Sequence, residues 1–256
     1  MEEAAANSPY LSLVFPVFNQ EGRLVKSLSE IIEFLSKKPF RSELILIEDC
    51  GQDRSLEILQ DFERRSIERI EVVVFTNPRN RGKGYSVRKG VERARGRYII
   101  FMDIDLAYSL EDIDRVLSYL IAGYDLSIAC RTLPDSVYHI SPSFFQYLYT
   151  RHLLSRLLNR AVRLWLGLAA HDTQAGLKGF ARVGAQKIFG VQRLDRFSFD
   201  VEVLYLAKIL GLRVKEVPVT FRYHNEPTTV HFVRDAIEMA YDLWRIRWWS
   251  WIGRYR

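Results

Sequence analysis

Short apolar runs alternate with amphipathic segments along the first half of the chain. Four runs have the mostly apolar character of strands that are buried on both faces of a parallel sheet. They are Leu11–Val17, Glu43–Glu48, Glu71–Phe75 and Tyr98–Met102. Between them, apolar residues recur at helical spacing, over Leu24–Leu35, Leu56–Phe62 and Tyr85–Ala94. This alternation predicts an α/β fold with a mostly parallel central sheet and right-handed crossovers.

The fourth run ends in two carboxylates separated by one residue, Asp103 and Asp105. Residues i and i+2 of an extended chain point to the same side, so both carboxylates can bind one hard divalent cation. Ligands of open α/β sheets collect at the carboxyl ends of the strands, where this pair is expected to lie. Such a pair can hold Mg²⁺ or Mn²⁺ against a diphosphate and offset the charge of the leaving group. Alternatively, Asp105 only starts a turn or caps a helix that begins near Ser109.

Polar residues also follow the other three runs, and we expect them to face the same crevice. They are Asn19, Gln20 and Glu21, then Glu48, Asp49 and Asp53, then Lys83. A lysine between glycines at a helix start can bind phosphate through N–H groups and charge; alternatively, Gly82 and Gly84 only close a plain loop. The first loop lacks G-x-G-x-x-G and residues 80–84 do not match a P-loop, which disfavours both of those nucleotide-binding classes.

A set of motifs, in this order along the chain, resembles the family 2 glycosyltransferases of GT-A fold. They are Pro16–Glu21, Glu48–Asp49 with Asp53, Asn80–Gly84, Asp103–Asp105, Asp172–Lys178 and Phe199–Glu202. The last two are similar to the branch of that family that contains the dolichyl-phosphate glucosyltransferases and mannose synthases. The resemblance implies a GT-A catalytic domain over residues 9–230, with a nucleotide-binding half (9–125) and an acceptor half (126–230).

By resemblance, the first two loops hold the base and ribose of a UDP- or GDP-sugar, and the diphosphate lies beyond them. The matching donor-site residues are Pro16, Phe18, Asn19, Glu21, Asp49, Lys83 and Asp103. Phe18 stands where the family usually has Tyr. Ala107, two residues after Asp105, stands where mannose synthases commonly have a Gln, and this favours a UDP-sugar.

Arg131 directly follows a fifth predicted strand, Leu126–Cys130, where the family has an Arg for the acceptor phosphate. With Arg151 and Ser155, it is expected by resemblance to bind the phosphate of a polyprenyl lipid. A phosphate is already anionic at neutral pH, so it needs no strong general base. From the residues alone, Arg131 is instead a surface side chain that pairs with Asp135.

Three further acidic positions follow. Asp172 is the remaining catalytic candidate, facing the sugar or ordering the arginines, although it could also be a turn or N-cap acid. Asp200 and Glu202 are expected only to cap and orient a helix over Val201–Leu210. His224, in the loop after a strand predicted over Val214–Phe221, is a candidate for closing the site.

Two segments are basic and amphipathic, Ser143–Leu168 and residues 231–256. The second carries Trp244, Trp248, Trp249 and Trp251 among arginines, a composition typical of the headgroup zone of a membrane. We expect residues 231–256 to form a membrane-interface helix. The plainer interpretation of the first segment is a core helix with a solvated basic side, and aromatic and basic residues can also bind single-stranded nucleic acid.

Composition adds bounds to this interpretation. The net charge of +6 favours anionic partners, and 48% hydrophobic residues allow a full core. Two distant thiols, Cys50 and Cys130, disfavour a zinc site and indicate a reducing compartment. Residues 1–8 are predicted to be a disordered tail rather than a signal peptide, and no apolar window reaches the roughly 20 residues of a spanning helix.

Together these features predict an inverting glycosyltransferase, peripheral at the cytoplasmic face of a membrane. It would move a glucose-like or mannose-like sugar from a nucleotide-sugar to polyprenyl or dolichyl phosphate, with Mg²⁺ or Mn²⁺ and without a nucleic-acid partner. One alternative is a family 2 enzyme that acts on a soluble saccharide or polysaccharide. The other is a non-enzymatic module that binds anionic membranes or nucleic acid.

Overall fold

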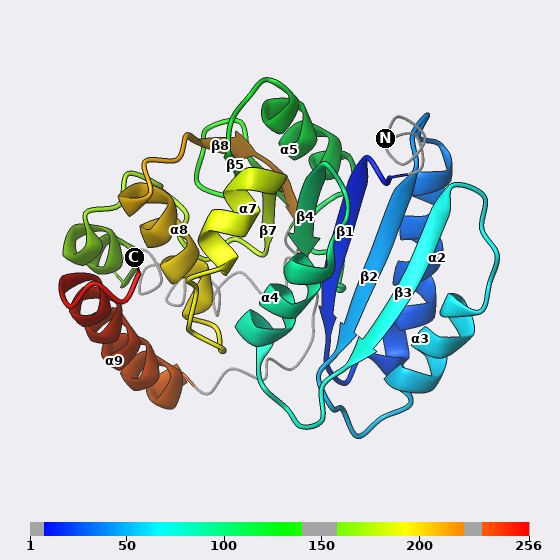
Figure 1. The fold of residues 1–256 in the computed structure, drawn as a ribbon, viewed down its shortest axis with the longest axis horizontal. Helices are drawn as coiled ribbons and strands as arrows, with labels where there is room; N and C mark the ends of the chain where they lie inside the picture. The colour runs from blue at the N-terminus through cyan, green and yellow to red at the C-terminus, as the bar shows by residue number, and fades with distance from the viewer. Residues whose placement is uncertain (1–7, 140–157, 223–231, 256) are drawn as a thin grey trace.

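The apolar runs form the strands of one seven-stranded sheet (Figure 1). A computed structural model describes residues 8–139, 158–222 and 232–255 of the chain, with side chains described from residue 237 in the last range. The sheet strands are β1 (Leu11–Val17), β2 (Ser42–Glu48), β3 (Ile70–Thr76), β4 (Tyr98–Met102), β5 (Leu126–Cys130), β7 (Leu177–Ala181) and β8 (Val214–Pro218). Their order across the sheet is β3-β2-β1-β4-β7-β5-β8.

All strands of this sheet run in one direction except β7. Strand β7 lies between β4 and β5 and is antiparallel to both. The carboxyl ends of the parallel strands therefore meet at one edge, toward which the arrows of β1, β2 and β3 point at the bottom of Figure 1. Because β7 runs the other way, the residues that precede it reach that same edge. This topology brings residues 172–176 to the end of β4.

Helices cover both faces of the sheet (Figure 1). One face packs against α2 (Glu21–Ser36), α3 (Ser55–Glu63) and α5 (Glu111–Ile121). The other packs against α4 (Lys83–Arg93), α7 (Arg182–Phe189) and α8 (Phe199–Ile209). A helix over residues 158–166 and α9 (Phe232–Trp251) add apolar residues to the second cluster. A small second sheet pairs β6 (Val137–His139) with β9 (Thr220–Arg222).

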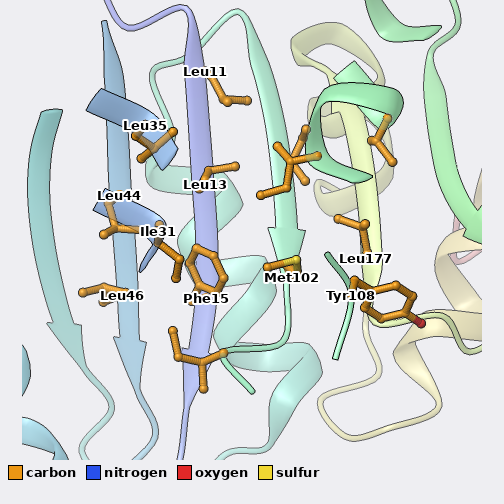
Figure 2. Packing of buried hydrophobic residues seen from close by; sticks show 14 of the residues in the cluster. Leu11, Leu13, Phe15, Ile31, Leu35, Leu44, Leu46, Met102, Tyr108 and Leu177 are labelled. Carbon is orange, nitrogen blue, oxygen red and sulfur yellow. The ribbon is translucent and has the colours of Figure 1, made fainter. Parts of the chain in front are cut away.

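Alternate residues of β1 face opposite layers, which fixes its register. Leu11, Leu13 and Phe15 point to the α2 side, where Ile31 and Leu35 meet them (Figure 2). Val14 belongs to the opposite cluster. All six of these side chains are buried, and each such burial contributes roughly 1.5–3 kcal/mol to stability. The packing holds the strand ends, and hence the polar loops that follow them, in fixed positions.

The elements predicted for the first 130 residues are confirmed, but the acceptor half differs from expectation. Strands β6 and β7 and helix α7 were not predicted. The single strand expected over Val214–Phe221 is wrong, because it divides into β8 and β9. Pro218 has no N–H to extend the ladder, and the N–H of Val219 donates to Ser136 Oγ at 3.2 Å. The proposed boundaries at residues 8, 125 and 230 remain predictions.

Candidate functional site

Asp103 lies at the end of β4 against the segment that leads into β7. Its N–H donates to the carbonyl of Gly176 (3.1 Å), and the N–H of Gly176 donates to the hydroxyl of Tyr108 (3.1 Å). A Cβ on residue 176 would overlap the Asp103 carboxylate. The glycine therefore lets the backbone of one half of the chain form a wall of the carboxylate site in the other half.

Lys83, the first residue of α4, forms an ion pair with Asp103. Its Nζ lies 2.7 Å from Oδ1 and 3.0 Å from Oδ2 of Asp103, and 3.9 Å from Oδ2 of Asp200. Burial disfavours the charged form of Lys83, but the two carboxylates outweigh it and raise the pKa of this lysine. The lysine and the aspartate that were predicted to bind the diphosphate and the metal thus lie together.

Asp105 lies next to this ion pair, and its charged form is stabilised less well than that of Asp103. Its Oδ1 accepts a hydrogen bond from the N–H of Ala107 at 3.0 Å. Burial and the neighbouring Asp103 charge raise the pKa of Asp105 above its usual range. A divalent cation would relieve both effects, so the two carboxylates fit a metal. Within the described residues no cluster of three or more His, Cys, Asp or Glu forms.

The loops that follow β1 and β2 are bound to each other by the predicted donor-site residues. Asn19, at a positive φ of 52°, accepts a hydrogen bond from the N–H of Gln52 (2.8 Å). The backbone N–H of Glu21 donates to the carboxylate of Asp53 (2.8 Å). The carboxylate of Glu21 in turn accepts a hydrogen bond from the backbone N–H of Arg54 (3.1 Å). The two loops therefore form one rigid unit at the strand ends.

Two other predicted donor-site residues flank these loops. Pro16 is half-buried within β1 opposite Ile47, and Phe18 is 39% exposed just after the strand. An exposed aromatic ring beside the strand ends is available to contact a base. These placements agree with the donor-site prediction but do not test it.

Asp49 is buried and shapes the loop that precedes Lys83. Its Oδ1 accepts from Asn77 Nδ2 (2.7 Å) and the N–H of Arg81 (2.8 Å), and its Oδ2 accepts from the N–H of Gly82 (2.7 Å). The carboxylate thus holds the turn into α4. A direct contact between Asp49 and a nucleotide remains a prediction.

The segment between α7 and α8, residues 190–198, packs closely against the glycines on either side of Lys83 and is called the clamping segment here. Gly82 has a φ of 95°, and a Cβ there would lie 2.7 Å from the carbonyl oxygen of Asp195. A Cβ on Gly84 would lie 2.5 Å from the carbonyl oxygen of Leu194. The Asp195 carboxylate pairs with Arg81 at 3.0 Å and Arg88 at 2.6 Å. Only glycine at positions 82 and 84 allows the backbone of residues 194 and 195 to approach this closely. The sequence of residues 80–84 alone did not indicate this contact.

Glu202 anchors this clamping segment. It accepts hydrogen bonds from the N–H groups of Leu194 (2.7 Å) and Arg193 (3.1 Å), and from the hydroxyl of Tyr255 (2.7 Å). Asp200 instead binds Lys178. Helix α8 has no side-chain cap at its N-terminus, so the prediction that these two acids cap and orient it is wrong as regards capping. Both bind distant segments because they lie fully inside the structure.

The acceptor half contributes a further arginine that is paired with a carboxylate. Arg131 makes a bidentate pair with Asp172, with Nε to Oδ2 at 2.7 Å and an N–H to Oδ1 at 3.0 Å. Burial disfavours ionisation of Asp172, but the charge and hydrogen bonds of Arg131 outweigh this effect and lower the pKa of Asp172. Arg131 therefore pairs with Asp172, and the alternative partner Asp135 is wrong. Asp172 is only 2% exposed, which agrees with ordering the arginine rather than facing the sugar.

A groove lies beside this pair. It has a volume of about 660 Å³ and lies between the helix over residues 158–166 and the loops next to Arg131 and Asp172. Its lining residues are Thr132, Asn159, Arg160, Arg163, Leu164, Gly167, Leu168 and His171. The predicted acceptor residues Arg151 and Ser155, and also His224, lie outside the described residues.

Comparisons with known proteins agree with this geometry. Residues 12–189 match the family described as Glycosyl transferase family 2. A dolichyl-phosphate beta-glucosyltransferase from Dictyostelium discoideum is 31% identical over 96% of this chain and 76% of its own length. The mouse protein of that name is 31% identical over 93% of this chain and 74% of its own.

Solved structures share the fold. A glucosyl-3-phosphoglycerate synthase from Mycobacterium tuberculosis, in complex with Mn²⁺, UDP and glucosyl-3-phosphoglycerate, superposes with a TM-score of 0.64. It is 17% identical and covers 95% of this chain and 82% of its own. At this level of identity, the similarity establishes the GT-A type of fold that the sequence predicted.

Substituting Gly176→Ala should damage the carboxylate site without unfolding the protein. The added methyl group meets the Asp103 carboxylate, so we expect Mn²⁺ affinity to fall by about tenfold or more, equivalent to about 1.4 kcal/mol. Titration calorimetry measures the affinity. The matched control is Gly22→Ala on α2, where a Cβ would meet nothing within 4 Å. Equal Mn²⁺ affinities in the two variants would contradict the assignment.

Proposed function

The chain belongs to glycosyltransferase family 2, and we propose that within this family it transfers glucose from UDP-glucose to dolichyl phosphate. Dolichyl-phosphate beta-glucosyltransferase is the name of relatives that match more than nine tenths of the chain. The single observation that carries the proposal is the arrangement at one sheet edge. There, paired carboxylates at Asp103 and Asp105 share a site with Lys83.

The donor diphosphate is proposed to lie over the end of β4. Asp103 and Asp105 would hold a divalent cation, Mg²⁺ or Mn²⁺, which when bound neutralises charge on the leaving diphosphate. Lys83 supplies a further positive charge at the start of α4, where helix N–H groups also favour phosphate. Ala107, the names of the relatives and the UDP in solved structures of the same fold support UDP as the nucleotide.

The acceptor is proposed to enter from the side of Arg131. Its phosphate is already anionic, so the protein has to bind and aim it rather than deprotonate it. Asp172 fixes the plane of the Arg131 guanidinium, and a guanidinium is the side-chain group that best matches the geometry of phosphate oxygens. Attack from the face opposite the departing diphosphate inverts the anomeric centre. The groove of about 660 Å³ beside Thr132 would take the first part of the lipid chain.

The test of this function is release of UDP from UDP-glucose. We expect release only when dolichyl phosphate and Mg²⁺ or Mn²⁺ are both present. Asp105→Asn should lower kcat by about 100-fold or more, the range typical of a lost electrostatic contact in a transition state. Arg131→Ala should mainly raise the KM for dolichyl phosphate.

Lys187→Met, an exposed side chain on α7, is the matched control and should behave as the unmodified protein. Turnover with a soluble saccharide and no lipid would contradict the proposed acceptor and favour the polysaccharide alternative. If neither dolichyl phosphate nor a soluble saccharide supports turnover, and nucleic acid binds in a salt-sensitive way, an enzymatic role would be contradicted.

The aromatic side of α9 is proposed to rest in a membrane interface. Tyr241, Trp244, Trp248 and Trp251 form a row in which successive ring centroids lie 6.2, 5.6 and 5.4 Å apart. All four are exposed, and Trp251 most, at 80%. Trp249 is buried and packs in the core instead. Exposed indole rings beside arginines suit the headgroup zone.

This placement would bring the active site to a lipid surface, and we propose the cytoplasmic face. Among the described helices, none is both long and apolar enough to cross a bilayer. Trp165, on the helix over residues 158–166, lies beside the row and lines a groove with Trp244 and Trp248. The aromatic surface therefore extends toward the acceptor groove.

Removing part of this row should weaken membrane binding. For Trp244→Ala with Trp248→Ala, we expect binding to vesicles that contain anionic lipid to fall by about 30-fold, since each of the two exposed rings can contribute roughly 1 kcal/mol. Co-sedimentation measures it, while turnover of a water-soluble short-chain acceptor should be kept. The control pair is Val25→Ala with Ile121→Ala, two exposed apolar residues elsewhere. Equal vesicle binding in the two pairs would refute the interface.

A further inference from the structure

Lys83 occupies both oxygens of the carboxylate that a metal would need. Its Nζ contacts Asp103 Oδ1 at 2.7 Å and Oδ2 at 3.0 Å. A divalent cation on Asp103 would bind the same oxygens and would repel the ammonium group. The metal and the lysine therefore compete for Asp103, and binding of the ion weakens the contacts between Lys83 and these oxygens.

A second carboxylate lies within reach of the same lysine. Asp200 Oδ2 is 3.9 Å from Lys83 Nζ, while Asp200 Oδ1 binds the fully buried Lys178. Lys178 also donates to the carbonyl of Ala175 at 2.6 Å. Asp200 thus presents Oδ2 to Lys83 and Oδ1 to Lys178. The ion pair with Lys178 fixes the position of the Asp200 carboxylate.

Two aromatic rings lie near the ammonium group of Lys83. Lys83 Nζ lies 6.0 Å from the ring centroid of Phe101 and 5.8 Å from that of Phe199. A cation near ring faces keeps a favourable interaction while it exchanges one carboxylate for the other. Its short displacement toward Asp200 would leave it close to the site expected for the diphosphate.

We propose that Lys83 is an internal placeholder for the metal and that Asp200, held by Lys178, is the positioning residue that receives it. In the metal-free protein Lys83 neutralises Asp103. When the cation binds Asp103 and Asp105, Lys83 moves toward Asp200 and turns its charge to the diphosphate. The inference rests on the proposed nucleotide-sugar function only for the identity of that diphosphate.

The experiment measures binding of Mn²⁺ alone and then of UDP with Mn²⁺, by calorimetry and Mn²⁺ electron paramagnetic resonance. Lys83→Met removes the competitor, so Mn²⁺ alone should bind about tenfold more tightly than to the unmodified protein. UDP in the presence of Mn²⁺ should bind more weakly. A lysine with a merely structural role would not produce these opposite changes.

The receiving carboxylate is tested with Asp200→Asn combined with Lys178→Met, which removes both charges of the buried pair and so avoids leaving one unpaired. Lys83 then keeps Asp103 as its partner, and Mn²⁺ should bind several-fold more weakly. Lys187→Met should bind Mn²⁺ as the unmodified protein does. Circular dichroism and Tm confirm folding, and Lys83→Met alone decides the question if the double variant does not fold.

Mn²⁺ affinity that is unchanged or weaker in folded Lys83→Met would overturn the inference. So would unchanged Mn²⁺ affinity in the folded double variant. No acceptor or sugar is present in these measurements, so failure of lipid glycosylation would leave this result intact. Conversely, a failed placeholder test would leave the transfer activity to be judged by its own assay.

Discussion

The ion pair between Lys83 and Asp103 is the interaction on which the site depends. Two aspartates at the end of a buried strand repel each other, and burial raises that cost. One internal cation offsets it, and much of the surrounding structure serves to place that cation. Glycines at 82 and 84 allow the clamping segment to approach, and Glu202 anchors the clamp from the other side. The two carboxylates proposed to hold the metal are thereby kept in place.

The reversed strand β7 joins the donor and acceptor halves of the molecule. Because it runs against its neighbours, the residues before it arrive at the edge of the sheet where the parallel strands end. Within five residues, Asp172 orients Arg131 and Gly176 lies against Asp103. The same strand carries Lys178 into the core beside Asp200. One short segment therefore connects the carboxylate proposed to bind the metal, the lysine and the arginine proposed for the acceptor.

The sequence predicted what local patterns can encode. Buried strands, the helices between them and the carboxylates at Asp103 and Asp105 follow from periodicity and from the rule that loops at strand ends carry function. Partnerships across long stretches of chain could not be read in this way. A role for Asp172 in ordering the arginines was expected only as one of two alternatives and only once the resemblance had placed Arg131 in the site, because the two residues lie 41 positions apart. Lys178 lies in a strand of only five residues, which is too short to stand out. The lysine inside an otherwise apolar strand was the available signal for a buried counter-ion.

The most direct measurement is a crystal structure of the chain with Mn²⁺ and UDP bound. The account predicts Mn²⁺ on Asp103 and Asp105, with Lys83 Nζ displaced from Asp103 and within contact of Asp200 or a diphosphate oxygen. If Lys83 still bound both oxygens of Asp103 while Mn²⁺ and UDP lay elsewhere, the central claim would be contradicted.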